Sequence, residues 1–129
     1  MQTSLDSQFK ETEAGKEADK ILRKCVHCGF CNAVCPTYQL SGNELEGPRG
    51  RIYIIKNALE GNKVSFASLS RLDHCLTCLS CESTCPSGVD YHQLLNIGRE
   101  WIEKNNKRPL SQRIFRNLLC RIIPNKPLL

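Results

Sequence analysis

Eight of the nine cysteines in this 129-residue chain fall into two copies of one pattern, and this repeat restricts the fold more than any other feature. Each copy has the spacing C-x2-C-x2-C-x3-C-P; the first runs from Cys25 to Pro36 and the second, fifty residues later, from Cys75 to Pro86. Aromatic residues make up only 6% of the chain. Small domains with so few large apolar side chains usually rely on disulfides or bound metals for stability.

The pattern favours metal ligands over disulfides. The chain starts Met1-Gln2-Thr3-Ser4-Leu5, without a basic or apolar leader, so we expect no secretory signal, and no long apolar run predicts a membrane span. We therefore expect a cytoplasmic protein, in a compartment where thiols bind metals or carry out redox chemistry. The odd number of cysteines agrees, since disulfides alone would leave one thiol over.

The spacing is typical of iron–sulfur binding. Three cysteines at i, i+3 and i+6 on a tight loop can point their sulfurs into one concavity, and in two-cluster ferredoxins the fourth cysteine ligates the other cluster. Carried over to this chain, that arrangement predicts two [4Fe–4S] clusters. The first would be held by Cys25, Cys28, Cys31 and Cys85, and the second by Cys75, Cys78, Cys81 and Cys35.

Four further residues are expected beside the clusters. Pro36 and Pro86 have no backbone N–H and a fixed φ, which turns the chain away from the metal after each fourth cysteine. Arg49 and Arg51 are candidates for offsetting cluster charge or for hydrogen bonding near Cys35. Ordinary polarity at a turn and a helix start is an equally good interpretation of both arginines.

Zinc is the main alternative metal. Two four-cysteine zinc sites would use the same side chains, although structural zinc sites favour separated C-x2–4-C pairs over a triplet followed by Cys-Pro. A zinc interaction module without a redox role is therefore a second hypothesis.

The apolar spacing outside the motifs predicts helices, and alternating strand patterns are nearly absent. We expect helices over residues 14–24, 48–60, 64–74, 91–105 and 111–123. The expected fold class is mostly α, a helical ferredoxin-like domain with both clusters on loops between helices. We divide the chain into a mobile N-terminus with a lead-in helix (1–24), the two-cluster domain (25–103) and a basic amphipathic C-terminal helix with its tail (104–129).

Charge is uneven along the chain. From Lys104 onward there are seven basic residues and no acidic one, beside apolar residues at helical spacing. Such a helix could dock on a partner or lie peripherally on the inner face of an anionic membrane, and a packing helix with solvated flanks is the plain alternative. Cys120 lies among these apolar residues and is expected to be a buried, inert thiol. The formal net charge of +5 is too small to argue for a nucleic-acid partner.

Several segments outside the cysteine spacing resemble the iron–sulfur subunit of glycolate oxidase (glycolate dehydrogenase). The cluster motifs alone are generic to electron carriers, and the Gly-Pro-Arg-Gly-Arg-Ile and Tyr-His…Ile-Gly-Arg segments raise the resemblance to family level. It covers roughly Ile21 to the end, through residues 25–31, 35–38, 42–44, 47–52, 75–78, 85–89 and 91–99.

The resemblance implies an electron-transfer subunit of a flavin-dependent 2-hydroxy-acid oxidoreductase. It would relay single electrons from FAD in partner subunits, where glycolate becomes glyoxylate, toward a quinone or another acceptor, without substrate catalysis by this chain. The absence of a nucleotide-binding motif agrees with this. Related subunits of lactate, glycerol-3-phosphate and heterodisulfide oxidoreductases share the fold and are the alternative. Members continue into cysteine-rich domains with Cys-Cys-Gly motifs, so we expect a truncated or split form that works with a further cysteine-rich domain or subunit.

Overall fold

The computed structural model describes residues 1–106 and 108–124, and within these ranges its regular elements are all helical. The mostly α fold class is therefore confirmed. In chain order the elements are α1 Ser7–Lys10, α2 Glu13–Lys24, α3 Phe30–Ala33, α4 Pro36–Ser41, the 3₁₀ turn η1 Glu44–Glu46, α5 Pro48–Leu59, α6 Phe66–Asp73, α7 Ser80–Ser83, α8 Tyr91–Asn105 and α9 Leu110–Ile122. Lys107 and residues 125–129, which belong to the expected C-terminal segment and tail, lie outside the described residues.

The longer helices begin at residues suited to capping. The side chains of Thr12, Ser65 and Asp90 accept hydrogen bonds from the first-turn amides of α2, α6 and α8. Pro48 occupies the first position of α5, where its missing N–H costs no intrahelical hydrogen bond. These caps set the points at which the chain leaves each loop and enters the helical body.

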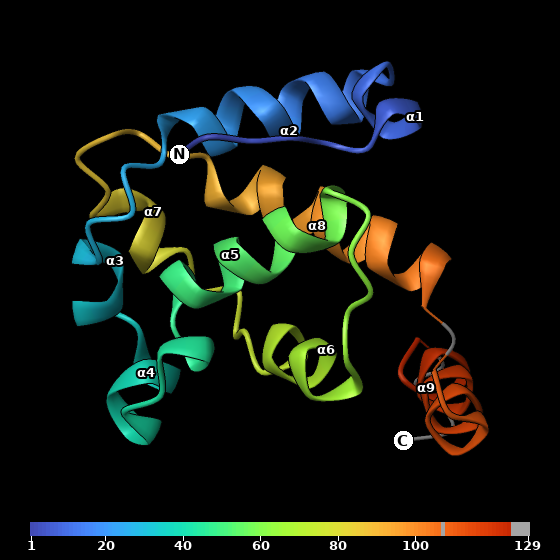
Figure 1. Cartoon of the computed structure of the whole chain (residues 1–129). Helices are drawn as coiled ribbons and strands as arrows, with labels where there is room; N and C mark the ends of the chain where they lie inside the picture. Colours follow the sequence, from blue (N-terminus) through green and yellow to red (C-terminus); the bar gives the residue numbers. More distant parts are fainter. Residues whose placement is uncertain (107, 125–129) are drawn as a thin grey trace.

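The apolar core lies where α2, α5 and α8 pack side by side, with α6 below them in Figure 1. Each fully buried leucine or isoleucine in such a core contributes roughly 1.5–3 kcal/mol relative to exposure. The fully buried apolar side chains of these four helices are Ile21, Leu22, Ile55, Leu59, Leu72, Leu94, Leu95 and Ile102. The short helices α3, α4 and α7 gather at the other end of the molecule, where the cysteines lie.

The N-terminal segment differs from the mobile stretch predicted over residues 1–13. Leu5 and Phe9 are buried in the core, and the Phe9 ring lies 4.4 Å from that of Trp101. The backbone N–H of Asp6 donates to the Leu59 carbonyl at 2.9 Å. Two apolar side chains four residues apart are enough to fasten a polar segment, because they share one face of its single helical turn.

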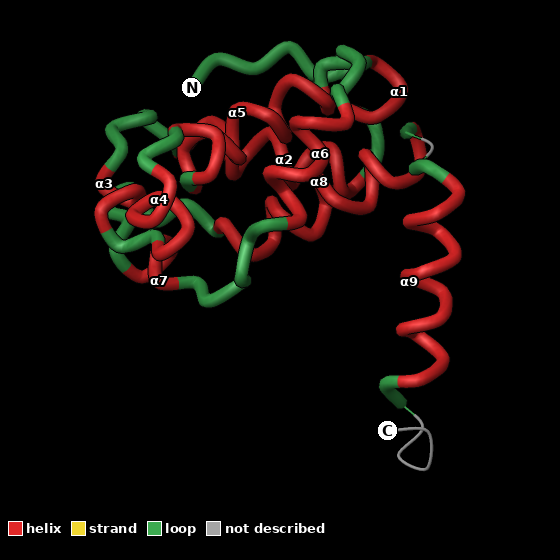
Figure 2. Tube along the Cα trace, turned by 90° about the horizontal axis from the view of Figure 1, so that it is seen from below, coloured by secondary structure: helices red, strands yellow, loops and turns green. Residues whose placement is uncertain are grey.

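Helix α9 stands away from the body, as Figure 2 shows. It is held at its base by Arg108, whose guanidinium donates to Asp73 and Glu103 at 2.6 Å, and by Arg116, which pairs with Asp73 at 3.7 Å. Cys120, predicted to be buried, is exposed, because no other described element packs against this part of α9.

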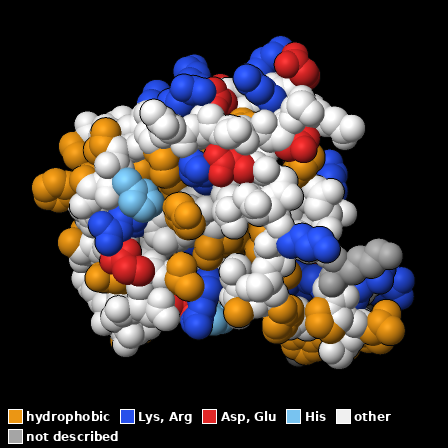
Figure 3. Space-filling view, in the orientation of Figure 1, with side chains coloured by type: hydrophobic (Ala, Val, Ile, Leu, Met, Phe, Trp, Pro, Cys, Tyr) orange, Lys and Arg blue, Asp and Glu red, His pale blue; other side chains and the backbone are white. Residues whose placement is uncertain are grey.

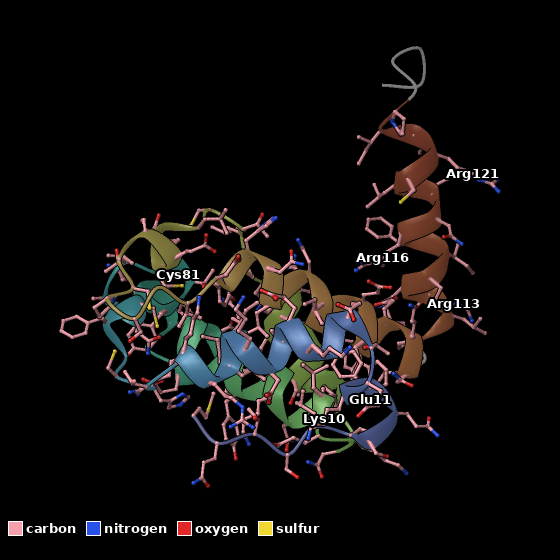
Figure 4. All side chains as sticks on the ribbon, turned by 90° about the horizontal axis from the view of Figure 1, so that it is seen from above. Lys10, Glu11, Cys81, Arg113, Arg116 and Arg121 are labelled. Atoms are coloured by element: carbon pink, nitrogen blue, oxygen red, sulfur yellow. The ribbon has the colours of Figure 1, made fainter. Side chains whose placement is uncertain are left out.

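The exposed apolar face of α9 lies beside basic side chains, toward the lower right of Figure 3. It comprises Leu110, Ile114, Phe115, Leu118, Leu119 and Ile123. Arg113 and Arg121 project from the side turned away from the body, whereas Arg116 projects toward it (Figure 4). No helix in the described ranges combines the length and apolarity that a membrane crossing requires.

Candidate metal centres

The two cysteine triplets fold into loops of the same backbone conformation. In the first loop His27 and Gly29 have φ values of 60° and 88°, and at the equivalent positions of the second loop Thr77 and Leu79 have 53° and 59°. Left-handed residues other than glycine cost of order 1–3 kcal/mol each and persist where surrounding structure fixes them. Alternation of left- and right-handed residues turns successive N–H groups into one concavity, a geometry that recurs at iron–sulfur sites. The loops are therefore shaped to surround a group that accepts hydrogen bonds.

Both loops continue into a single helical turn, α3 or α7, and then into the fourth cysteine. Cys35 is the N-cap of α4, and Pro36 is the first residue of that helix, so the proline redirects the chain as predicted. In the second copy Cys85 and Pro86 lead into a turn instead of a helix. The shared geometry places each fourth cysteine on the far side of its own triplet.

The first cavity joins the Cys25–Cys31 loop to the far end of the second repeat. Its walls include Gly29, Arg49 and Pro86, together with the four sulfurs predicted for the first cluster, those of Cys25, Cys28, Cys31 and Cys85. The structure therefore brings together three cysteines of one copy and the fourth cysteine of the other.

The second cavity has the reciprocal composition. Pro36, Arg51 and Tyr91 line it, together with the four sulfurs predicted for the second cluster, those of Cys35, Cys75, Cys78 and Cys81. In the described part of the chain, no three His, Cys, Asp or Glu side chains are placed to hold a single metal ion. A zinc site needs four ligands at about 2.0–2.3 Å from one point. Four sulfurs around a cavity instead fit a polynuclear cluster.

The two cavities share a wall made of Pro48, Cys81 and Tyr91. Cys81 is buried at the α3 and α7 end of the molecule, where Figure 4 labels it. Groups bound in the two cavities would be immediate neighbours.

Comparison with known proteins agrees with this geometry: residues 21–89 match the 4Fe-4S dicluster domain. The chain belongs to the 4Fe-4S dicluster domain family. The dicluster domain binds two [4Fe–4S] clusters, which confirms the predicted cofactors.

Curated relatives extend the match beyond the dicluster domain. The chain is 58% identical over 124 residues to the glycolate oxidase iron-sulfur subunit of Escherichia coli (strain K12), covering 96% of this chain and 30% of that protein. It is 41% identical over 114 residues to the probable glycolate oxidase iron-sulfur subunit of Bacillus subtilis (strain 168), covering 87% and 25%. The chain thus spans less than a third of either relative, and the predicted resemblance is confirmed at this level.

A more distant relative belongs to the ferredoxin:CoB-CoM heterodisulfide reductase of Methanosarcina mazei. This polypeptide of the reductase is 32% identical over 100 residues, which cover 77% of this chain and 58% of that protein. No solved structure gives a significant match.

Several thiols of the dicluster domain are buried in a way that disfavours the free thiolate. Burial, followed by the neighbouring Cys25, raises the pKa of Cys31 to about 11. Burial, followed by Cys31 and Cys75, raises the pKa of Cys81 to about 12. Cysteine must be deprotonated to ligate metal, so binding compensates the charge of these sulfurs and displaces their protons.

Arg51 lies directly beside the second cavity, in agreement with one of the two interpretations of this residue. Its side chain is only 1% exposed, and its Nη1 lies 3.9 Å from the Cys35 sulfur. Its Nη2 donates to Glu46 at 3.2 Å and to the Thr37 hydroxyl at 3.1 Å. A fully buried guanidinium is thus held with one edge on a carboxylate and the other toward a ligand sulfur.

Arg49 occupies the corresponding position at the first cavity but is less enclosed. It pairs with Glu44 at 2.8 Å, and its guanidinium covers Gly29, where an added Cβ would lie 2.8 Å from Nη1. No side-chain hydrogen bond from Arg49 to a cysteine sulfur is found in the described residues. Its charge is balanced mainly by Glu44.

Two functional residues escaped the sequence analysis. Tyr91 is 3% exposed, its hydroxyl lies 3.7 Å from the Cys75 sulfur, and burial raises the pKa of this hydroxyl. Glu46 is buried, although Glu-Gly-Pro is typical of an exposed turn, and it accepts hydrogen bonds from Arg51, Arg71 and His74. Tyr91 lies in the segment that resembles the glycolate oxidase subunit, which was the available signal; for Glu46 the sequence offered none.

Proposed function

We propose that this chain is the electron-transfer portion of an oxidoreductase complex. The observation that supports it most directly is the pair of four-cysteine cavities with a common wall. When bound, [4Fe–4S] clusters supply one-electron transfer and cannot accept a hydride, so a two-electron substrate must react in another subunit. The chain's own residues hold the clusters, exclude water from them and keep them adjacent, without substrate catalysis.

We also propose that ligation is crossed between the repeats. Cys25, Cys28 and Cys31 would hold the first cluster with Cys85, and Cys75, Cys78 and Cys81 would hold the second with Cys35. The composition of the two cavities supports this pairing. Pro36 and Pro86 would shape the exits from Cys35 and Cys85, and Arg49 and Arg51 would face the bound clusters.

For the complex as a whole, similarity supports the oxidation of glycolate to glyoxylate. Both closer relatives carry glycolate oxidase in their names. We propose that FAD in a partner subunit accepts the electron pair and that this chain passes the electrons singly toward a quinone or another acceptor. Relatives at about 30% identity, which include the heterodisulfide reductase polypeptide and lactate utilization protein B, keep a related donor as the alternative.

The surface that supports complex formation is α9. Its apolar face is exposed, and the charges beside it in the described residues are basic, so its partner would present an apolar groove with an acidic rim. We propose a further cysteine-rich domain or subunit of the same complex as this partner. The complex would work in the cytoplasm, at the inner face of the membrane if a quinone is the acceptor.

Metal and sulfide analysis of anaerobically purified protein tests the function. We expect a brown protein with about eight irons and eight inorganic sulfides, and signals of both reduced clusters by electron paramagnetic resonance (EPR). A colourless protein with zinc in both sites would contradict the proposal. Copurification with a flavoprotein, and bleaching of its flavin by glycolate in preference to lactate, would identify the donor.

Substitution of single ligands tests the crossed pairing. Cys28→Ser and Cys78→Ser each alter one cluster and so assign the two EPR signals. Cys85→Ser is expected to alter the same signal as Cys28→Ser, although Cys85 belongs to the other repeat. If Cys85→Ser affects the Cys78 signal instead, the pairing is uncrossed. Cys120→Ser is the matched control and should leave both signals and the iron content unchanged.

A further inference from the structure

The two cavities differ in the polar groups directed at their sulfurs. At the second cavity, Arg51 approaches Cys35 at 3.9 Å and the Tyr91 hydroxyl approaches Cys75 at 3.7 Å. Once Cys75 is a thiolate it can only accept, so Tyr91 must donate. At the first cavity, no side chain of the described residues makes a hydrogen bond to the sulfur of Cys25, Cys28, Cys31 or Cys85.

The charges behind the two cavities differ in the same sense. Arg51 and Arg71 share one carboxylate, Glu46, so this group has two permanent positive charges and one negative charge. At the first cavity Arg49 is matched one to one by Glu44. Arg51 is also fully buried, whereas Arg49 is 31% exposed, and water screens a buried charge far less.

Other features of the two sites are balanced. Each set of ligands has one exposed cysteine, Cys28 or Cys78, so neither cluster is closed off from solvent. Each loop also receives one cationic contact on a backbone carbonyl: Met1 donates to Cys25 at 2.7 Å and Arg99 donates to Cys75 at 3.4 Å. The contrast is therefore confined to Tyr91 and the Arg51 group.

We propose that the cluster in the second cavity has the higher reduction potential of the two, so that electrons run from the first cavity to the second. Reduction adds one negative charge, and donors or net positive charge beside the sulfurs stabilise that state more than the oxidised one. Because the cavities share Pro48, Cys81 and Tyr91, the two sites exchange electrons directly and the electron rests on the favoured side. The inference rests on the crossed ligation proposed above.

In this arrangement Tyr91 and Arg51 are positioning residues that act through ligand sulfurs. They give the relay its direction: the first cavity faces the electron donor, and the second faces the acceptor.

The test is a potentiometric titration of the cluster-loaded full chain followed by EPR, with signals assigned by the Cys28→Ser and Cys78→Ser variants. In the wild type the second-cavity cluster should be reduced first. Tyr91→Phe removes only the hydroxyl and should lower the reduced-to-oxidised ratio of that cluster at a fixed potential by about tenfold, which is ~59 mV for one electron. The ratio of the first-cavity cluster should not change.

Two further variants keep the inference falsifiable. Tyr53→Phe removes an exposed tyrosine hydroxyl and should change neither ratio. Arg51→Lys retains the charge but loses the guanidinium edge toward Cys35, so it should shift the second-cavity cluster in the same direction as Tyr91→Phe. Prior reduction of the first-cavity cluster in the wild type, or equal shifts of both clusters in Tyr91→Phe, would overturn the inference. Both outcomes are distinct from failure of the proposed function, in which iron and sulfide would be absent.

Discussion

At the scale of single residues, Arg51 and Glu46 form the most enclosed ion pair of the described structure. Their side chains are 1% and 6% exposed, and the atoms Nη2 and Oε2 are 3.2 Å apart. Removing one partner of a buried pair leaves an uncompensated charge, at a cost of about 3–5 kcal/mol. The network is therefore both a stability element and the support of the second metal site.

Glu46→Gln should destabilise the cluster-loaded protein by about 3 kcal/mol, because Arg51 and Arg71 would lose their common carboxylate. The matched control is Glu44→Gln in the same 3₁₀ turn, since Glu44 is 46% exposed and its pair with Arg49 contributes up to about 1 kcal/mol. Thermal unfolding under anaerobic conditions measures both. Equal shifts of the two midpoints would contradict the role given to Glu46.

Glu60 links the N-terminal segment to α5, and this link should depend on pH. Burial raises the pKa of Glu60, but hydrogen bonds from Lys56 and the Ser4 backbone outweigh it and hold the pKa below its ordinary value. A carboxylate with a lowered pKa stabilises the fold above its unfolded pKa of about 4.3, and this contribution disappears as pH falls through the folded pKa.

Glu60→Gln should therefore loosen residues 1–5 at neutral pH, at a cost of up to about 1 kcal/mol, and should flatten the acid dependence of stability below about pH 4.3. Limited proteolysis of the N-terminal segment, followed across the acid range, measures this. Glu13, with a side chain 92% exposed, provides the control Glu13→Gln. An unchanged acid profile in Glu60→Gln would show that other carboxylates control the N-terminus.

Residue spacing predicted the site only where the chemistry is local. The two triplets can be recognised in the sequence because three ligands of each cluster lie within seven residues. The contacts of Tyr91 with Cys75 and of Glu46 with Arg71 could not be predicted, because they depend on how separate helices approach one another. The exposure of Cys120 has the same origin, since an apolar sequence neighbourhood does not say whether another element covers it.

At the scale of elements, α5 and α8 cross at a point that only glycine allows. A Cβ at Gly98 would lie 2.7 Å from both Cγ1 and Cγ2 of Ile55, closer than real carbon contacts. These atoms adjoin the branch point of a buried side chain and cannot swing aside freely. The absence of a side chain at residue 98 thus sets the separation of the two helices that form the core.

Gly98→Ala should destabilise the protein by about 1–2 kcal/mol, because overpacking costs roughly 1–3 kcal/mol and better helix propensity returns up to about 1 kcal/mol. Ile55→Ala removes the opposing atoms, and the double variant should show a favourable coupling of about 1 kcal/mol or more. Thermal midpoints of the four proteins measure the cycle. Additive effects would mean that the helices do not meet at this pair.

Helix prediction succeeded for the elements with a long apolar period and failed for the shortest. The last helix was expected over residues 111–123 and is Leu110–Ile122. By contrast, α1, α3 and α7 are four-residue turns, which have too few residues for a periodic pattern and form only because tertiary contacts or bound groups fix them. This explains why residues 1–13 looked mobile in the sequence.

At the scale of the whole molecule, two different kinds of core lie at opposite ends. One is the apolar contact of α2, α5, α6 and α8, and the other consists of the cysteine cavities between α3, α4 and α7. The first is stabilised by buried aliphatic side chains. The second has strained left-handed residues and single helical turns, so it depends on the bound clusters.

Chelation of the iron should therefore release one end of the molecule and leave the other folded. Hydrogen exchange should become faster at residues 25–35 and 75–85 together, because crossed ligation ties each loop to the opposite repeat. The amides of α5 and α8 should keep most of their protection, because their hydrogen bonds lie in the apolar core. Mass spectrometry of the exchanged protein before and after chelation measures both regions at once.

The Cys85→Ser variant distinguishes a crossed staple from two independent sites in the same experiment. With crossed ligation, loss of this one ligand from the second repeat should raise exchange in the Cys25–Cys31 loop, fifty or more residues away in sequence, before any chelator is added. Faster exchange confined to the Cys75–Cys81 loop would mean that each repeat holds its own cluster. Loss of protection throughout α5 and α8 would mean instead that the apolar end cannot fold without the metal, which its fully buried side chains argue against.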